Sequence, residues 1–125
     1  MRSVAVIVED SRGRVLLLQR GLTDPWMPGR WNLPGGGVEY GESEKAAGMR
    51  ETYEEAGLRV YALSPVTEIA SSNQPSLVVL RADDWDGRVR LLDGENVRSA
   101  WVPRQVAWTW DLIPPHREVL RRLTF

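Results

Sequence analysis

The sequence contains no cysteine. Disulfide bonds, zinc–thiolate sites and thiol nucleophiles are therefore excluded. The chain also lacks a large excess of charge, because 16 basic and 17 acidic residues leave a formal net charge of −1. So small a net charge gives no general attraction to nucleic acid or to an acidic membrane surface. Any site for a polyanion must therefore be built locally, from a bound cation or a few arginines.

Low-complexity tracts, internal repeats and long hydrophobic runs are absent as well. The apolar run from Val4 to Val8 is too short for a signal peptide or a membrane span and is typical of a strand. We therefore expect a cytoplasmic protein with neither a membrane nor a nucleic acid polymer as partner. With 125 residues, 42% hydrophobic and 26% charged, the composition predicts one globular domain over residues 1–125.

The apolar periodicity and the chain breakers predict a series of strands interrupted by one long helix and closed by a short one. The helix is expected over 43–56, with Ser43 as N-cap and Gly57 at its end. A final helix is expected from Pro114, a loop over 21–34, flexible glycines at 35–37 and a turn at 83–87. Strands are expected over 4–8 and 15–18, joined as a hairpin, and over 66–70, 76–81, 89–92 and 100–102. This order indicates an α/β or α+β fold with a mixed sheet flanked by helices.

Three glutamates share one side of the predicted helix over 43–56. Glu51, Glu54 and Glu55 are neighbours by i,i+3 and i,i+4 spacing, whereas the expected apolar face holds Ala46, Met49, Tyr53 and Ala56. Each pair of like charges costs about a few tenths of a kcal/mol, and a single arginine cannot neutralise three carboxylates. A hard cation such as Mg²⁺ could, since it prefers oxygen ligands. The spacing alone leaves a solvated acidic face open as the alternative.

The segment from Gly36 to Leu58, GGVEYGESEKAAGMRETYEEAGL, resembles the Nudix box. That signature is a glycine, five residues, a glutamate, seven residues and then Arg-Glu-aliphatic-any-Glu-Glu-any-Gly-aliphatic. Thr52 departs from it by replacing an aliphatic residue, which concerns packing rather than catalysis because threonine has the shape of valine. The preceding Leu-Pro-Gly-Gly and the end of the chain, DLIPPHREVLRRL, are similar to MutT-like members. The positions that match the signature are Gly36, Glu42, Arg50, Glu51, Glu54, Glu55, Gly57 and Leu58.

The resemblance implies the Nudix fold, an α/β/α sandwich, and a hydrolase that cleaves a nucleoside diphosphate linkage with Mg²⁺, or with Mn²⁺ as the alternative cation. Arg50 is implied to pair with Glu51 and orient it. The resemblance leaves open whether Glu51 or Glu95 is the general base. Glu95 lies outside the box, and its alternative is to be a solvated residue of a polar turn. The implied metal ligands are Glu51, Glu54, Glu55 and the backbone of Gly35 or Gly36.

The substrate side of the site is less specified. Six tryptophans are many for this length, and a nucleobase can stack on an aromatic ring. We expect substrate contacts from Trp31, Arg20, Glu39 and His116, each with an ordinary structural role as its alternative. His116, the only histidine, lies where MutT-like proteins use a side chain to read the base.

The leading interpretation is a MutT-like (d)NTP pyrophosphohydrolase that acts on a small nucleotide as a monomer or homodimer. Hydrolysis of ADP-ribose or a nucleotide sugar is the second enzyme interpretation. A Nudix-like nucleotide-binding domain without catalysis is the third, although such domains usually lose box glutamates that this chain keeps.

Overall fold

The structure, a computed structural model, describes residues 2–70, 72–73 and 75–124. Its four-stranded sheet has the order β4-β1-β6-β5, and its three-stranded sheet has the order β3-β2-β7. Strand β1 pairs parallel with β6 and antiparallel with β4, so the larger sheet is mixed, as expected. In chain order the elements are β1 (Ser3–Ile7), β2 (Arg14–Arg20), β3 (Trp31–Asn32), β4 (Gly35–Gly37), α1 (Glu44–Ala56), β5 (Arg59–Ile69), β6 (Leu77–Asp86), β7 (Asn96–Pro103), α2 (Arg104–Ala107) and α3 (Pro114–Thr124).

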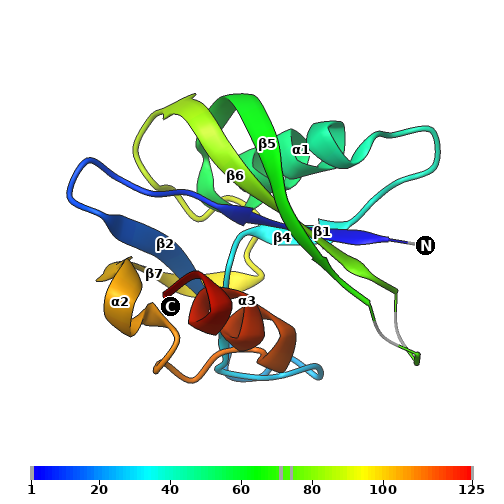
Figure 1. Ribbon diagram of the computed structural model, residues 1–125. Helices are drawn as coiled ribbons and strands as arrows, with labels where there is room; N and C mark the ends of the chain where they lie inside the picture. The colour runs from blue at the N-terminus through cyan, green and yellow to red at the C-terminus, as the bar shows by residue number, and fades with distance from the viewer. Residues whose placement is uncertain (1, 71, 74, 125) are drawn as a thin grey trace.

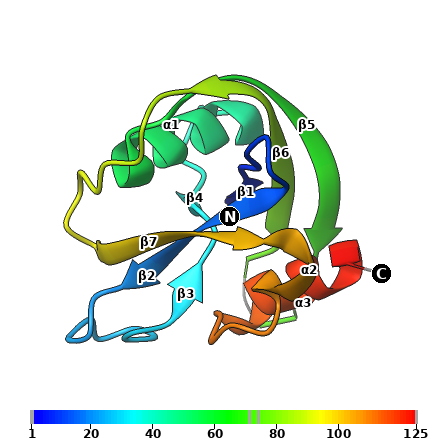
Figure 2. The same ribbon diagram turned by 90° about the vertical axis from the view of Figure 1, so that its left-hand side faces the viewer.

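The central strands are buried on both faces, and alternate side chains enter two different hydrophobic cores. Val4 and Val6 of β1 face the core that contains Ala47 and Ala56 of α1, whereas Ile7 faces the core on the side of α3. This alternation follows from the two-residue period of a strand. Figures 1 and 2 show α1 on one side and α2 and α3 on the other, with the strands of both sheets between them. The expected helix–sheet–helix sandwich is confirmed.

Three expectations about the strands and their connections were wrong. The hairpin over 4–18 forms only at its turn, where Glu9 bridges Val15, because β1 and β2 then enter different sheets. No strand forms over 89–92, and the expected turn at 83–87 is mostly strand, since β6 continues to Asp86. Strand β6 pairs with β5 as far as Asp86, beyond the polar residues that suggested a turn. Neither β3 nor α2 was predicted, and β5 begins at Arg59, well before the strand expected over 66–70.

The glycines at 35–37 are not a flexible segment, because they form β4 and pair with β1. Their lack of side chains allows this strand to lie close to its neighbours. A Cβ on Gly36 would lie 2.7 Å from the carboxyl carbon of Glu51. The backbone thus passes where any larger residue would displace a side chain of α1.

Helix α1 begins and ends as predicted, but its buried face differs from the expected one. Ser43 accepts a hydrogen bond from Ala46 N, and Gly57 closes the helix in the left-handed conformation. Ala46 and Tyr53 are exposed. The helix instead packs through a narrower strip, in which a Cβ on Gly48 would lie 3.1 Å from the side chains of Leu63 and Leu80. The buried residues of α1 are Ala47, Gly48, Thr52, Glu55 and Ala56.

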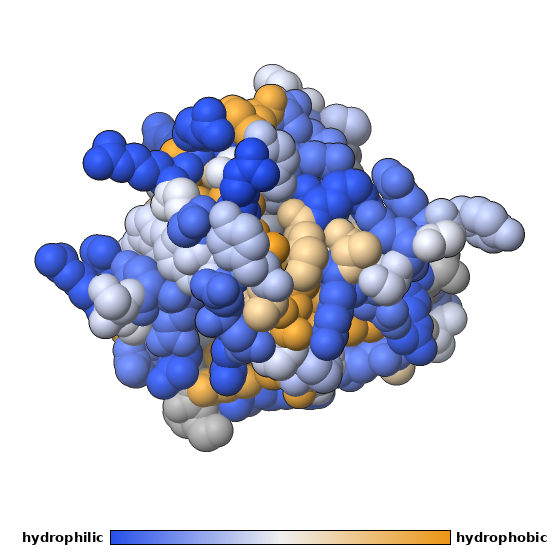
Figure 3. Space-filling view, turned by 90° about the horizontal axis from the view of Figure 1, so that it is seen from above, coloured by the Kyte–Doolittle hydropathy of each residue, from blue (hydrophilic) through white to orange (hydrophobic). Residues whose placement is uncertain are grey.

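The surface seen from above Figure 1 is mainly hydrophilic, with apolar side chains visible near the centre, at the top and along the lower part of the view (Figure 3). No helix within the described ranges is both long and apolar enough to cross a membrane. Helix α3 begins at Pro114 as predicted and carries its apolar side inward, because Val119 and Leu120 are fully buried.

Candidate active site

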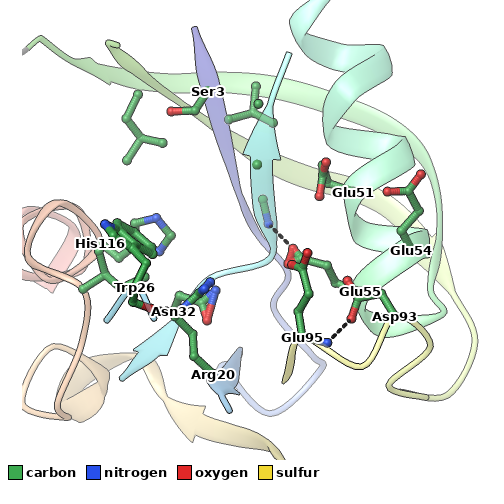
Figure 4. A pocket seen from close by; sticks show the side chains of 16 residues that line it. Ser3, Arg20, Trp26, Asn32, Glu51, Glu54, Glu55, Asp93, Glu95 and His116 are labelled. Atoms are coloured by element: carbon green, nitrogen blue, oxygen red, sulfur yellow. Dashed lines mark hydrogen bonds between the residues drawn. The ribbon is translucent and has the colours of Figure 1, made fainter. Parts of the chain in front are cut away.

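A cavity of about 420 Å³ lies beside β4, within the size range of small-molecule sites. Its residues come from distant parts of the chain: α1, the loop before β7, the end of β2, β3 and the start of α3. Figure 4 shows acidic side chains gathered on one side, and His116, Trp26, Asn32 and Arg20 on the other. We call these the acidic half and the polar–aromatic half of the cavity. The acidic half consists of Glu51, Glu54, Glu55, Asp93 and Glu95.

Carboxylates from two separate segments meet in the acidic half. One oxygen each from Glu55, Asp93 and Glu95 lies within 4.8 Å of the others. Glu55 comes from the helix, whereas Asp93 and Glu95 come from the loop that precedes β7. Asp93 accepts a hydrogen bond from Glu95 N at 3.0 Å, which shapes this loop. Glu95 was predicted from the sequence and Asp93 was not, although their i,i+2 spacing in a polar turn was an available signal.

Glu55 is the most confined of these acids, with only 3% of its surface exposed. Its Oε1 accepts a hydrogen bond from Gly35 N at 2.9 Å. Burial raises the pKa of Glu55 to about 9, and the negative charges of Glu51, Asp93 and Glu95 add to the rise. A carboxylate in such surroundings is stabilised in its ionised form by a bound cation. The all-oxygen donor set therefore fits Mg²⁺ or another hard divalent ion.

Arg50 does not line the cavity, but it contacts acids that do. Its guanidinium donates to Glu51 at 2.7 Å, to Glu54 at 3.2 Å and to the carbonyl of Gly37 at 3.0 Å. It also donates twice to Glu42, from Nε at 2.8 Å and from Nη2 at 3.0 Å, and these hydrogen bonds lower the pKa of Glu42 to about 2. Arg50 therefore fixes the glutamates of α1 and the adjoining loop relative to β4.

Two opposing effects act on the pKa of Glu51. Burial raises its pKa, the nearby Arg50 opposes this rise, and the charges of Glu54 and Glu95 reinforce it. Its side chain is 15% exposed, compared with 50% for that of Glu54. The three helix glutamates thus share one site but differ widely in contact with solvent.

In the polar–aromatic half, Arg20 organises the loop that carries Trp26. Its guanidinium contacts Asp24 at 2.7 Å, donates to the Trp26 carbonyl at 2.9 Å and lies 4.8 Å from the centre of the Trp26 ring. Trp26 itself is 50% exposed. Arg20 thus holds an open aromatic surface at the cavity.

The remaining predicted substrate residues are divided between the cavity and other parts of the structure. His116 lines the cavity, as predicted. Trp31 does not, because its ring packs edge-to-face on Trp110 with 4.8 Å between centroids. Glu39 is also outside the lining, with an exposed side chain 3.7 Å from Arg50. Asn32, which the sequence analysis did not select, lines the cavity and is buried.

Comparison with known proteins agrees with this arrangement. The NUDIX domain family matches residues 1–123. A Mycobacterium tuberculosis protein named as an 8-oxo-dGTP diphosphatase is 35% identical over 114 residues, which cover 81% of each chain. An RNA pyrophosphohydrolase of Dinoroseobacter shibae is 34% identical over 92 residues, 71% of this chain and 54% of that protein.

A solved MutT structure, from work on Aliivibrio salmonicida and Vibrio cholerae, shares the fold. It superimposes with a TM-score of 0.84 at 22% identity and covers 98% of this chain and 95% of its own. The family match extends over almost the whole sequence and includes the glutamates of α1. This protein belongs to the Nudix hydrolase family.

Proposed function

We propose that this protein is a Mg²⁺-dependent, MutT-like nucleoside triphosphate pyrophosphohydrolase that releases a nucleoside monophosphate and pyrophosphate. One observation carries the proposal: a single cavity joins five carboxylates to an exposed tryptophan and a histidine. The carboxylates suit a metal-bound polyphosphate, and the aromatic ring suits a base. The name of the Mycobacterium relative agrees with a purine nucleoside triphosphate as substrate.

Glu54 and Glu55, with Glu51 and the backbone of Gly35 or Gly36, hold the cation, and Asp93 is added to them because it lies with Glu55 and Glu95. The cation, when bound, neutralises phosphate oxygens and acidifies water. Arg50 keeps Glu51 in place, through the 2.7 Å contact.

The proton of the attacking water passes to a carboxylate, either Glu51 or Glu95. Water adds to one phosphorus of the cleaved anhydride and the bridging P–O bond breaks; the charge on the departing group would be neutralised by the cation that the acidic half would hold. Glu95 belongs to an exposed loop, whereas Glu51 is fixed by Arg50. The two bases are separated by the pH profiles of the Glu51→Gln and Glu95→Gln variants, because only loss of the base removes the limb that rises with pH.

The test is a substrate panel with Mg²⁺ that contains ordinary and oxidised (d)NTPs, ADP-ribose, nucleotide sugars and dinucleoside polyphosphates. We expect triphosphates to be the best substrates, with pyrophosphate as the product and no turnover in the presence of a chelator. Preferred hydrolysis of ADP-ribose would refute the triphosphate assignment. Nucleotide binding without product release from any member of the panel would refute the assignment of the protein as an enzyme.

The metal role is tested by Glu54→Gln, with Glu44→Gln as its control. Both substitutions remove one negative charge from α1, but Glu44 pairs with Arg2 outside the cavity. We expect Glu54→Gln to lower kcat/KM by roughly 100-fold or more, a loss typical of an electrostatic group in the transition state. Glu44→Gln should retain full turnover. Full turnover by Glu54→Gln would show that the assigned role is wrong.

A further inference from the structure

The loop over 21–30 and the loop before β7 meet at a backbone hydrogen bond, in which Gly21 N donates to the carbonyl oxygen of Glu95 at 3.0 Å. The carbonyl oxygen of Gly21 accepts from Asp24 N and from Gly29 N, both at 3.2 Å, and these bonds close the loop over 21–30. Gly21 does not line the 420 Å³ cavity. It nevertheless joins the loop of the polar–aromatic half to the segment that carries an acid of the acidic half.

A β-bulge on β7 brings Glu95 opposite Gly21. Beyond the pair of Gln19 with Arg98 the register of β2 and β7 shifts by one residue, so Val97 is an extra residue on β7. Had the register not shifted, Glu95 would lie one residue beyond Gly21, displaced by about 3.3 Å along the strand direction. Bulges are frequent next to active sites, where they redirect a side chain.

The backbone of Glu95 is bonded on both sides of its Cα. Its N–H donates to the carboxylate of Asp93 at 3.0 Å, and its carbonyl accepts from Gly21. Its own carboxylate, although the residue is exposed, belongs to the group that lies within 4.8 Å with Asp93 and Glu55 (Figure 4). Because the side chain starts between the two bonded backbone groups, moving the Glu95 carbonyl also moves the carboxylate.

We propose that Gly21 is a positioning residue, whose backbone N–H sets the place of Glu95 in the acidic half. This inference rests on the proposed function, in which Glu95 is a candidate base and a neighbour of the bound cation. Both partners in the bond are backbone atoms, so the bond does not depend on which side chains the loop over 21–30 carries. The alternative is a bond that only extends the pairing of β2 with β7.

Two substitutions at Gly21 separate the N–H from the glycine. Gly21→Pro removes the N–H and places a ring carbon against the Glu95 carbonyl, whereas Gly21→Ala keeps the N–H. A Cβ on Gly21 would lie 3.8 Å from the Glu95 carbonyl oxygen and from the Val97 side chain, which are ordinary contact distances. Gly21 is not among the glycines with positive φ, and Arg20 before it is in a strand, the conformation that proline favours in its predecessor.

We expect Gly21→Pro to lower kcat roughly 10- to 100-fold with a much smaller change in KM, because a misplaced group costs rate rather than binding. Gly21→Ala should lose little by comparison. In a protein that already carries Glu95→Gln, Gly21→Pro should lower kcat by no more than about twofold, because residues that act as a unit are not additive. A bond with a merely structural role would lower kcat by the same factor in both backgrounds.

The affinity of the nucleotide-free protein for Mg²⁺, measured by titration calorimetry, gives a second result without turnover. Gly21→Pro and Glu95→Gln should each weaken this affinity by about 10-fold, a loss typical of residues around a metal site, and Gly21→Ala should not. Different losses in Gly21→Pro and Glu95→Gln would contradict the proposal.

The proposal is also overturned if Gly21→Pro lowers kcat as much in the Glu95→Gln protein as in the unaltered one, or if its effect lies in KM alone. Should Gly21→Pro not fold, glycolic acid in place of Gly21 changes the same N–H to an ester oxygen without added bulk, and full kcat in that protein overturns the proposal. Weaker Mg²⁺ binding by Gly21→Pro, with no triphosphate hydrolysis by the unaltered protein, would refute the proposed function and keep the role of Gly21. Triphosphate hydrolysis with equal kcat for Gly21→Pro and Gly21→Ala would do the reverse.

Discussion

Glu55 is a carboxylate surrounded by other carboxylates, and its pKa of about 9 in the folded protein lies above the ordinary value of 4.5. The folded metal-free protein therefore binds a proton that the unfolded chain has lost. Its contribution to stability is complete below pH 4.5 and is lost as pH rises towards 9. We predict that the melting temperature of the metal-free protein falls across this range, and that Glu55→Gln makes the fall shallower.

Mg²⁺ should reverse the effect, because it binds the ionised carboxylate. For the unaltered protein, the rise in melting temperature on adding Mg²⁺ should grow with pH between 6 and 9, to several degrees. Glu55→Gln should show little of this rise. An undiminished Mg²⁺ effect in Glu55→Gln, followed by differential scanning fluorimetry, would place the cation elsewhere.

The close approach of Gly36 to Glu51 leads to a second prediction at the residue scale. A Cβ there would lie 2.7 Å from the Glu51 carboxyl carbon, whereas a Cβ on Gly37 would meet nothing within 4 Å. Gly36→Ala should displace the end of Glu51 and lower kcat by roughly 10- to 100-fold with little change in melting temperature. Gly37→Ala, in the same strand, should be active. Equal kcat values for the two variants would show that the position of Glu51 does not matter for the reaction.

The sequence could show that the helix glutamates are neighbours, but not which of them is buried. Spacing places Glu51, Glu54 and Glu55 together, yet only the packing against β4 decides that Glu55 faces inward. Asp93 and Asn32 carry no helical or metal-binding pattern. They reach the cavity only because the loop before β7 and the short strand β3 fold beside β4, which are long-range contacts that local patterns do not encode.

At the scale of elements, the loop over 21–30 depends on Arg20 for its shape. Arg20→Ala removes its contacts to Asp24 and Trp26, and we predict a KM about 5-fold higher with a smaller change in kcat, since an ordered aromatic surface for the substrate is lost. Arg59→Ala is the matched control, because Arg59 lies 5.2 Å from the Tyr53 ring, away from the cavity. A similar KM for both variants, from steady-state kinetics, would contradict this role.

Helix α1 gives a prediction about the one departure from the family signature. Thr52 is fully buried, and its hydroxyl donates to the Gly48 carbonyl at 2.7 Å, within the helix. Valine has the same shape and leaves the helical hydrogen bonds in place, so Thr52→Val should change the free energy of unfolding by less than about 1 kcal/mol. Activity should be unaltered. A large loss of kcat in a stably folded Thr52→Val protein would give the hydroxyl a part in the site.

Elements with strong local signals were predictable, and elements made by pairing were not. Helix α1 begins after Ser43 and ends at Gly57 because of capping contacts that depend on nearby residues only. The glycines of β4 have no strand propensity and become a strand through pairing with β1. The apolar residues at 89–92 have the propensity but no partner strand, and no strand forms there.

At the scale of the whole molecule, β1 contributes side chains to both hydrophobic cores. Val6 and Ile7 are adjacent in sequence but are buried in different clusters, at 0% and 2% exposure. Val6→Ala and Ile7→Ala should each destabilise by roughly 1–4 kcal/mol in chemical denaturation. Because the two side chains leave the strand on opposite faces, the double variant should be additive within about 0.5 kcal/mol. Val97→Ala, at an exposed position, should cost less than about 0.5 kcal/mol.

The position of β4 between the two halves of the cavity has a consequence for how such enzymes diversify. The acids that suit the phosphates come from α1 and the loop before β7, whereas the polar–aromatic half comes from the 21–30 loop, β3 and the start of α3. Mutations that accumulate after gene duplication can therefore remodel one group of segments while the other continues to serve the common chemistry. Under the proposed function, substrate choice and bond cleavage lie on separate stretches of one chain, so natural selection could exchange the former without rebuilding the latter.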